Sequence, residues 1–203
     1  MSVRTLRLEF LDTWHVGCGR GDGSNLDAVV ARDADALPYV PGRMLRGVLR
    51  DAAEALAAWG HADPAAVLQL FGGLAERSDA PGRSLSQAGC LTVSDARLPA
   101  AERAVLAAPA PGEPDPQAAL RAALFVPSFQ TAIDLDSGTA LDGSLRGVEL
   151  VVPLTLQAEV GITGVDADAP WALLDRALPL VRAIGAMKTR GHGRVALDWE
   201  KHA

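Results

Sequence analysis

Polar and apolar residues alternate over residues 3–11 and again over residues 145–162. Alternation with a period of two is typical of a strand that buries one face. The first stretch therefore predicts an N-terminal strand, and the second predicts one long strand, bent at Pro153. Two shorter stretches predict further strands at residues 90–95 and 194–200.

Apolar residues recur every three or four positions after Pro41, which predicts an amphipathic helix that ends near Gly60. A shorter helix is expected to begin at Pro64 and to end at the glycine pair 72–73, because proline suits a first helical turn and glycine suits a helix end. A third helix is expected over residues 170–184. Each predicted helix therefore lies between predicted strands.

The connecting segments are rich in glycine, proline and polar residues. Residues 17–36 are expected to form a glycine-rich acidic loop, and residues 74–88 a polar loop. Residues 97–142 are expected to form an insertion that starts as a surface excursion and includes a hairpin around the turn at residues 136–138. Without the insertions the order is strand, helix, strand, strand, helix, strand. This order predicts an α+β fold of the ferredoxin-like or RNA-recognition-motif type, with a four-stranded antiparallel sheet.

The composition fits one globular domain over residues 1–203, with 49% hydrophobic and 22% charged residues. This balance excludes global disorder. The sequence has no run of about 18 apolar residues, so no membrane-spanning helix is expected. The first ten residues are patterned as a strand and not as a signal peptide, and a cytoplasmic location is expected.

The formal net charge is −6, whereas proteins that bind nucleic acid on their own are usually basic. The exception is a subunit of an assembly in which one groove faces nucleic acid.

Residues 185–194 stand out against this acidic background because they carry Lys188, Arg190, His192 and Arg194 among three glycines. Glycines allow close backbone approach and cations suit phosphate, so this glycine loop predicts a local polyanion site. It is neither a P-loop nor a Rossmann fingerprint, because it follows a helix and enters a strand.

Three other groups of residues suggest chemistry. Arg43, Arg46 and Arg50 lie three or four positions apart on the first predicted helix, a spacing that suits successive phosphates. Asp27, with Asp22 and Asp33 in the same loop, could hold Mg2+ or accept a proton from an RNA 2′-hydroxyl. The hairpin at residues 129–140 carries Phe129 and Ile133, which could wedge between bases. Each group also has a plain interpretation, as a solvated helix face, soluble turn residues or a surface hairpin.

Together these motifs resemble the RAMP superfamily of CRISPR proteins, and within it the repeating backbone subunit of type III effector complexes. The resemblance runs from the first predicted strand to the last. The matching segments are residues 14–17, 26–27, 30–33, 37–42, 45–50, 70–72, 91–96, 131–134, 137–140 and 188–194.

The resemblance implies a protein that stacks along crRNA, with target RNA and other effector subunits, including copies of itself, as partners. It implies that residues 129–140 form part of a thumb that displaces bases. Asp27 matches the family's acid that cleaves target RNA with Mg2+ or another divalent cation, which implies a catalytic and metal-binding role. The candidate RNA-binding residues are His15, Arg20, Arg43, Arg46, Arg50, Phe129, Ile133, Lys188, Arg190, His192 and Arg194.

Three alternatives stay open. The chain could be a structural crRNA-binding subunit that does not cleave. It could be a guide-processing ribonuclease, for which His15 and His192 are the candidate acid–base residues. It could also be a ferredoxin-like domain that binds a small phosphorylated molecule through the glycine loop.

Overall fold

Four antiparallel strands form the central sheet of the computed structural model, which describes residues 1–23, 26–76, 84–107, 109 and 112–200. The strands lie in the order β4-β7-β1-β8. Their bounds are Ser2–Phe10 for β1, Leu91–Val93 for β4, Thr155–Ile162 for β7 and Val195–Trp199 for β8. With the helices between them, they confirm the predicted ferredoxin-like α+β fold.

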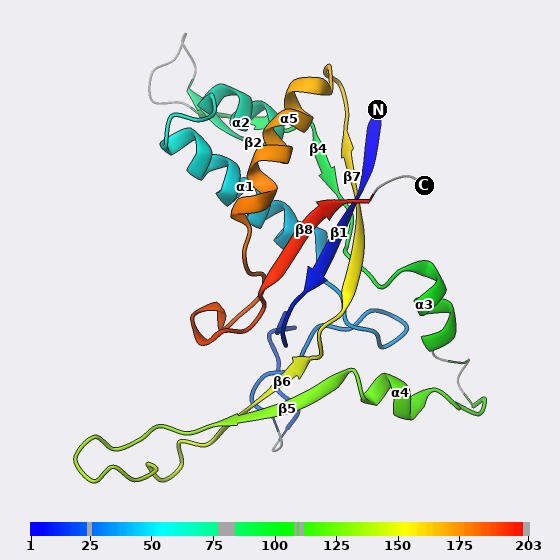
Figure 1. The fold of residues 1–203 in the computed structure, drawn as a ribbon, viewed down its shortest axis with the longest axis vertical. Coiled ribbons are helices and arrows are strands. Elements are labelled where there is room, and N and C mark those ends of the chain that lie inside the picture. Colours follow the sequence, from blue (N-terminus) through cyan, green and yellow to red (C-terminus); the bar gives the residue numbers. More distant parts are fainter. Residues whose placement is uncertain (24–25, 77–83, 108, 110–111, 201–203) are drawn as a thin grey trace.

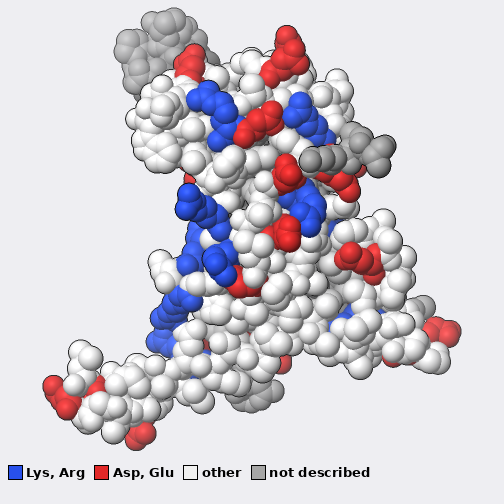
Figure 2. Space-filling view, in the orientation of Figure 1, with Lys and Arg blue, Asp and Glu red and all other residues white. Residues whose placement is uncertain are grey.

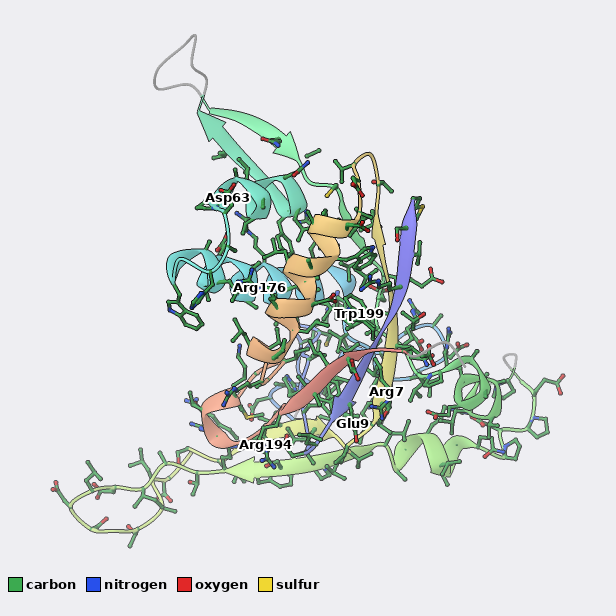
Figure 3. All side chains as sticks on the ribbon, turned by 45° about the horizontal axis from the view of Figure 1, so that its top comes forward. Arg7, Glu9, Asp63, Arg176, Arg194 and Trp199 are labelled. Carbon is green, nitrogen blue, oxygen red and sulfur yellow. The ribbon has the colours of Figure 1, made fainter. Side chains whose placement is uncertain are left out.

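Helices α1 (Gly42–Ala58) and α5 (Asp168–Ala177) cover one face of this sheet (Figure 1). Alternate residues of β1 point to this face, and Leu6 and Leu8 are fully buried there. The other face of β1 is polar, and Arg7 forms an ion pair with Glu9 at 2.8 Å (Figure 3). One face of the sheet is therefore the core and the other is open.

The prediction of one strand over residues 145–162 is wrong, because the chain changes sheets at residues 152–154. Strand β6 (Arg146–Val151) leaves the central sheet and pairs with β5 (Phe125–Gln130), whereas β7 pairs with β1. Pro153 has no N–H to give to a ladder. Its neighbours bond elsewhere: Val152 N donates to Leu124 O, and Leu154 O accepts from Phe10 N, both at 3.0 Å. Strands β5 and β6 extend into the long hairpin at the lower left of Figure 1.

Two further boundaries differ from the prediction. The segment 74–88, expected to be a polar loop, contributes to an antiparallel pair of β2 (Gly72–Glu76) and β3 (Ser84–Ala88), and residues 77–83 lie outside the described residues. The third helix does not reach residue 184: α5 ends at Ala177 and continues as the 3-10 turn η1 (Leu178–Leu180). Pro179 explains this end, because it lacks the N–H that an α-helix needs.

The remaining helices lie at the edges of the domain (Figure 1). They are α2 (Pro64–Phe71), α3 (Ala100–Leu106) and α4 (Ala118–Ala122). Asp63 caps α2 by accepting a hydrogen bond from Ala65 N at 2.9 Å, and Arg176 of α5 donates to the carbonyl of His61 just before it (Figure 3). In the part of the chain that the structure describes, no helix is long and apolar enough to cross a membrane.

Candidate nucleic-acid interface

The glycines of the 185–194 loop bring it close to the protein itself. A Cβ on Gly185 would lie 2.3 Å from His15 O, and one on Gly193 would lie 2.2 Å from Ile184 O. The backbone N–H groups of Ala186 and Gly193 bond to the segment after β1, at 2.8 and 2.9 Å. The close approach expected for a ligand is therefore used by the protein itself: Gly185 packs against His15 after β1, and Gly193 packs against Ile184.

The cationic side chains of the loop point outward from this fixed base. Lys188 and Arg190 lie in the short 3-10 turn η2 (Lys188–Arg190), and both are exposed, as are Arg194 and Arg182. We call these four residues the basic edge. Figure 2 shows Lys and Arg gathered along the left of the molecule, where Figure 1 draws the loop between α5 and β8. Arg194 is tied to Asp12, with Nε 2.5 Å from Oδ2, yet its side chain remains 65% exposed.

The basic edge meets the long hairpin at its base. Arg190 donates a hydrogen bond to the side-chain oxygen of Gln130, the last residue of β5. A cleft of about 210 Å³ lies there, lined by Gln130, Thr131, Ala132, Ser144, Arg146 and Arg190. Two cations thus face one small polar cleft, a suitable environment for a phosphate group.

Asp27 lies at the same hairpin base. Its Oδ2 accepts a hydrogen bond from Gly147 N at 2.8 Å, and its own N–H donates to Gly147 O at the same distance. Gly147 pairs with Phe129 across the hairpin, one position from the pair formed by Gln130 and Arg146. Asp27 is nevertheless exposed to solvent. The fold therefore brings the acid, the hairpin and the glycine loop together.

Buried contacts fix the loop that carries Asp27. Glu149 of β6 is only 8% exposed; it accepts a hydrogen bond from Val30 N at 2.9 Å and pairs with Arg32 at 2.6 Å. The Arg32 guanidinium also lies 4.0 Å from the centre of the Phe125 ring. These contacts anchor both the loop and the hairpin on β6.

The three acids of this loop do not form one group. Asp33 has a side chain only 2% exposed, and it pairs with Arg97 at 3.0 Å. Its other oxygen accepts from Asp35 N and Leu37 N, so Asp33 holds a turn. Asp22 is exposed and forms a backbone bridge with Leu26. Of the acids proposed from the sequence, Asp27 is the one that contacts the hairpin base.

The arginines of α1 point away from the basic edge. Arg46 donates to the carbonyl of Phe71 at the end of α2, and Arg50 pairs with Glu54 at 2.6 Å. Lys188 instead lies beside the α1 face that contains Val48. At ~100° per helical residue, these faces are on different sides of α1. Arg43 is exposed at the start of the helix.

The two candidate histidines differ in their access to solvent, and His192 lies within the glycine loop itself. His15 is 5% exposed, and its Nδ1 lies 2.6 Å from Glu149 O, so it packs inside the protein. His192 is half-buried, with Nδ1 2.9 Å from Thr13 Oγ1. Arg20 is exposed in the 17–36 loop. In this conformation His15 is not accessible to a bound strand.

Comparison with known proteins now decides the family. The sequence profile of the RAMP superfamily matches residues 7–196, nearly the whole chain. The chain belongs to the RAMP superfamily. A search of curated proteins finds no match.

The fold of this RAMP protein is similar to that of subunits in solved CRISPR complexes. Two structures of the type III-B Cmr-beta complex, in the apo state and bound to cognate target RNA, contain a chain with a TM-score of 0.69. The identities are 13% and 12%, over 98% of this chain and 97% of the other. A type IV-B CRISPR complex contains a chain with a TM-score of 0.62 and 18% identity, over 100% of this chain and 92% of the other. At these identities the likeness establishes the shared fold.

The hairpin of this RAMP protein exposes apolar side chains beyond its base. Phe129 is 58% exposed and Ile133 is 54% exposed, as the wedge hypothesis requires. Leu135, near the tip, is 96% exposed. The tip is also acidic, and hydrogen bonds from Ser137 and from the backbone N–H of Asp136 lower the pKa of Asp134. The anionic tip of the hairpin is therefore unsuited to contact with a phosphate group.

Asp27 fits a divalent cation only in combination with a substrate. Among the described residues, no group of three or more His, Cys, Asp or Glu side chains could hold a metal ion. Mg2+ is commonly held by one or two carboxylates together with substrate phosphates and water. Asp27 supplies one carboxylate, and Oδ1 accepts no hydrogen bond from the described part of the chain. The residues present are compatible with a cation that arrives with RNA.

Two residues of the interface were missed by the sequence analysis. Arg146 was assigned to a long strand, although it is the sole cation between Arg121 and Arg176. Arg182 was assigned to the third helix. The isolation of Arg146 in the sequence was a signal that could have identified it.

Proposed function

We propose that this RAMP protein is a backbone subunit of a type III CRISPR ribonucleoprotein that binds guide crRNA. One observation carries the proposal: Arg190, Gln130 and Asp27 are far apart in sequence but converge at the base of the hairpin. Cations, an exposed carboxylate and an exposed aromatic residue there suit a strand whose phosphates and bases must both be held.

The acidic net charge is compatible with this role. The basic edge is one local surface, so the remaining acidic surface is free to face solvent or other subunits. Binding through a few exposed cations releases counterions, and the affinity for RNA is therefore expected to fall steeply as salt rises. Tight RNA binding that is insensitive to salt would contradict the proposal.

We further propose that Asp27 supports cleavage of paired target RNA. The target 2′-oxygen attacks the adjacent phosphorus as its proton passes to a hydroxide ion or a water molecule, the bond from phosphorus to the 5′-oxygen breaks, and that oxygen takes up a proton from water. The products are a 2′,3′-cyclic phosphate and a 5′-hydroxyl. Asp27 would hold Mg2+ or another divalent cation, which supplies charge neutralisation at the phosphate when bound. The hydrogen bond from Gly147 would orient the carboxylate beside the hairpin.

The test uses the complete complex, purified with its co-expressed guide RNA and partner subunits. Asp27→Asn preserves an acceptor for Gly147 N but removes the charge. The variant complex should keep its crRNA and lose target cutting by about 100-fold or more, the usual scale for a catalytic group. Full cutting at every site by the variant would exclude the catalytic role. A wild-type complex without discrete RNA would exclude crRNA binding.

The non-cleaving alternative is favoured by a specific contact. Asp27 already has a structural function, since Oδ2 holds Gly147 at the hairpin base. A protein that binds crRNA without cutting would keep this contact for stability alone. Comparison of the wild-type and Asp27→Asn complexes separates the two roles. If the protein does not cleave, the wild-type complex lacks cutting activity just as the variant does. The guide-processing alternative is less well supported, because His15 is buried.

A further inference from the structure

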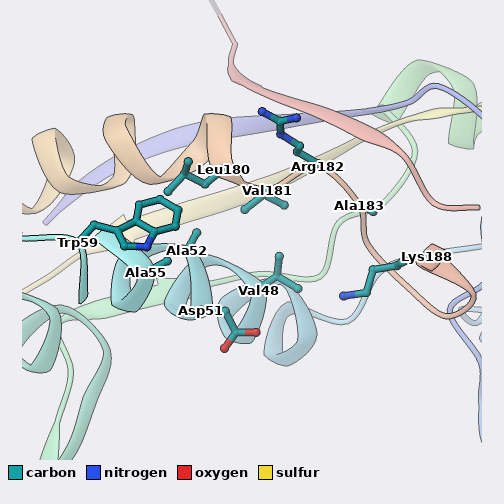
Figure 4. A pocket seen from close by; sticks show the side chains of 10 residues that line it. All are labelled: Val48, Asp51, Ala52, Ala55, Trp59, Leu180, Val181, Arg182, Ala183 and Lys188. Atoms are coloured by element: carbon teal, nitrogen blue, oxygen red, sulfur yellow. The ribbon is translucent and has the colours of Figure 1, made fainter. Parts of the chain in front are cut away.

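A groove of about 470 Å³ lies between α1 and the segment that follows α5 (Figure 4). Its lining is mostly apolar, with charged groups from both sides. The lining residues are Val48, Asp51, Ala52, Ala55, Trp59, Leu180, Val181, Arg182, Ala183 and Lys188. The interface described above uses Lys188 but none of the α1 residues of this groove.

Trp59 gives the groove an accessible aromatic wall. Its side chain is 62% exposed, whereas Trp14 and Trp171 are buried and Trp199 packs edge-on against Trp171 at 5.2 Å. The backbone of Trp59 is fixed, because its N–H donates to Ala55 O at 3.1 Å at the end of α1. An exposed indole on a fixed backbone is a suitable platform for a stacked base.

The charges of the groove suit a nucleotide strand. Arg182 and Lys188 are exposed, and neither forms an ion pair within the described residues. Figure 4 shows both on the side of the groove opposite α1, with the Lys188 amine directed back toward α1 and the Arg182 guanidinium directed away from it. Asp51 lies on α1, where its carboxylate can accept a hydrogen bond from a base amino group. The Lys188 amine, which suits a phosphate, and the Asp51 carboxylate, which suits a base edge, therefore lie on opposite sides of the groove.

The groove continues the basic edge. Lys188 belongs to both, and Arg190 of the same short turn reaches the hairpin base. From Val48 to Trp59 the groove runs about 16 Å along the helix axis, at ~1.5 Å per residue. A stacked strand advances ~3.4 Å per nucleotide, so the groove is long enough for several nucleotides.

We propose that this groove is a binding site for a short single-stranded segment of RNA. A base stacks on Trp59, and a phosphate that follows lies against Lys188. The proposal rests on the proposed function but adds a site on the opposite side of α1 from Arg46. It assigns the α1 contact with RNA to the groove face and not to the arginine face.

The test is a titration of the full chain with six-nucleotide oligouridylate and oligoadenylate at low salt. Stacking on Trp59 should quench tryptophan emission in the wild-type protein. Trp59→Phe should abolish this quench while keeping the affinity within about threefold, because phenylalanine still stacks. Trp59→Ala should weaken binding about tenfold, measured by anisotropy of a labelled oligonucleotide. Leu74→Ala, at an exposed apolar residue on β2, is the matched control and should change neither readout.

Two results would overturn the groove proposal. One is a quench that persists unchanged in Trp59→Phe, since the signal would then come from another tryptophan. The other is a change in the size of the RNA-free protein in Trp59→Ala, which would identify the groove as a protein contact. If either of these results is found and the purified complex still keeps its crRNA, the proposed function stands and the groove proposal alone fails. Loss of all RNA from the wild-type complex would instead remove the proposed function.

Discussion

The carboxylate of Asp27 accepts a hydrogen bond from the backbone N–H of Gly147 at 2.8 Å, across 120 positions of sequence. This contact joins the 17–36 loop to the hairpin, and it is reinforced by the bond from Asp27 N to Gly147 O. The candidate catalytic acid is therefore also a structural tether. A substitution at Asp27 can alter the hairpin as well as any chemistry.

The first prediction separates two roles of the Asp27 side chain: its hydrogen bond with Gly147 and its negative charge. Asp27→Ala removes the acceptor for Gly147 N, whereas Asp27→Asn keeps one. The amide of Gly147 should exchange with solvent about fivefold faster in the alanine variant, as expected for the loss of about 1 kcal/mol. Hydrogen exchange followed by NMR measures this rate. Equal protection in both variants would show that the tether does not depend on the Asp27 side chain.

The second prediction concerns the two cations at the cleft. Arg146→Ala and Arg190→Ala should each weaken binding of a single-stranded RNA, and each should lower the slope of log affinity against log salt by about 0.7, the value for one phosphate contact in a single strand. Arg7→Ala, on the open face of the sheet, is the control of equal charge change. The measurement is a set of titrations at several salt concentrations. Identical slopes in all three variants would place the phosphate contacts elsewhere.

The third prediction compares two glycines of one loop. Gly193 and Gly191 both have a positive φ, +77° and +86°, so alanine is strained at either position. Only at Gly193 would the Cβ also meet a backbone atom, Ile184 O at 2.2 Å; nothing described lies within 4 Å at Gly191. Urea unfolding should show a loss of about 1 kcal/mol for Gly191→Ala and of clearly more for Gly193→Ala. Equal losses would mean that the loop moves to accept the clash.

The fold was predictable from the sequence to a large extent. Apolar residues recur every second position in the strands and every three or four positions in the helices, and these apolar residues are the buried ones. Leu6 and Leu8 are fully buried as the alternation of β1 requires. The break at residues 152–154 was not predictable in the same way, since the alternation continues through it. Which sheet a strand joins depends on its distant partners, here β5 for one half and β1 for the other.

The site was less predictable for a related reason. Sequence spacing identified Arg46 and Arg50 as a phosphate-binding pair, but α2 and Glu54 occupy their guanidinium groups. It identified the glycines of the 185–194 loop as contacts for a ligand, but Gly185 and Gly193 pack on the protein's own backbone. A spacing specifies which residues share a face. It does not specify what the rest of the chain places against that face.

The fourth prediction concerns Glu149, the buried acid that anchors the loop of Asp27. Its side chain accepts from Val30 N and pairs with Arg32, which in turn lies over the Phe125 ring. Glu149→Leu leaves a buried N–H without its acceptor and an arginine without its partner. The free energy of unfolding should fall by about 2 kcal/mol, within the range for a buried N–H left without its acceptor, because the Arg32 side chain is 42% exposed and can be solvated without its partner. Glu149→Gln retains an acceptor for Val30 N and should lose about half as much. Urea unfolding of both variants measures the difference, and hydrogen exchange at Val30 reports on the loop itself. If the leucine variant were as stable as the wild type, hydrophobic packing and not the Glu149 carboxylate would hold the loop of Asp27 on β6.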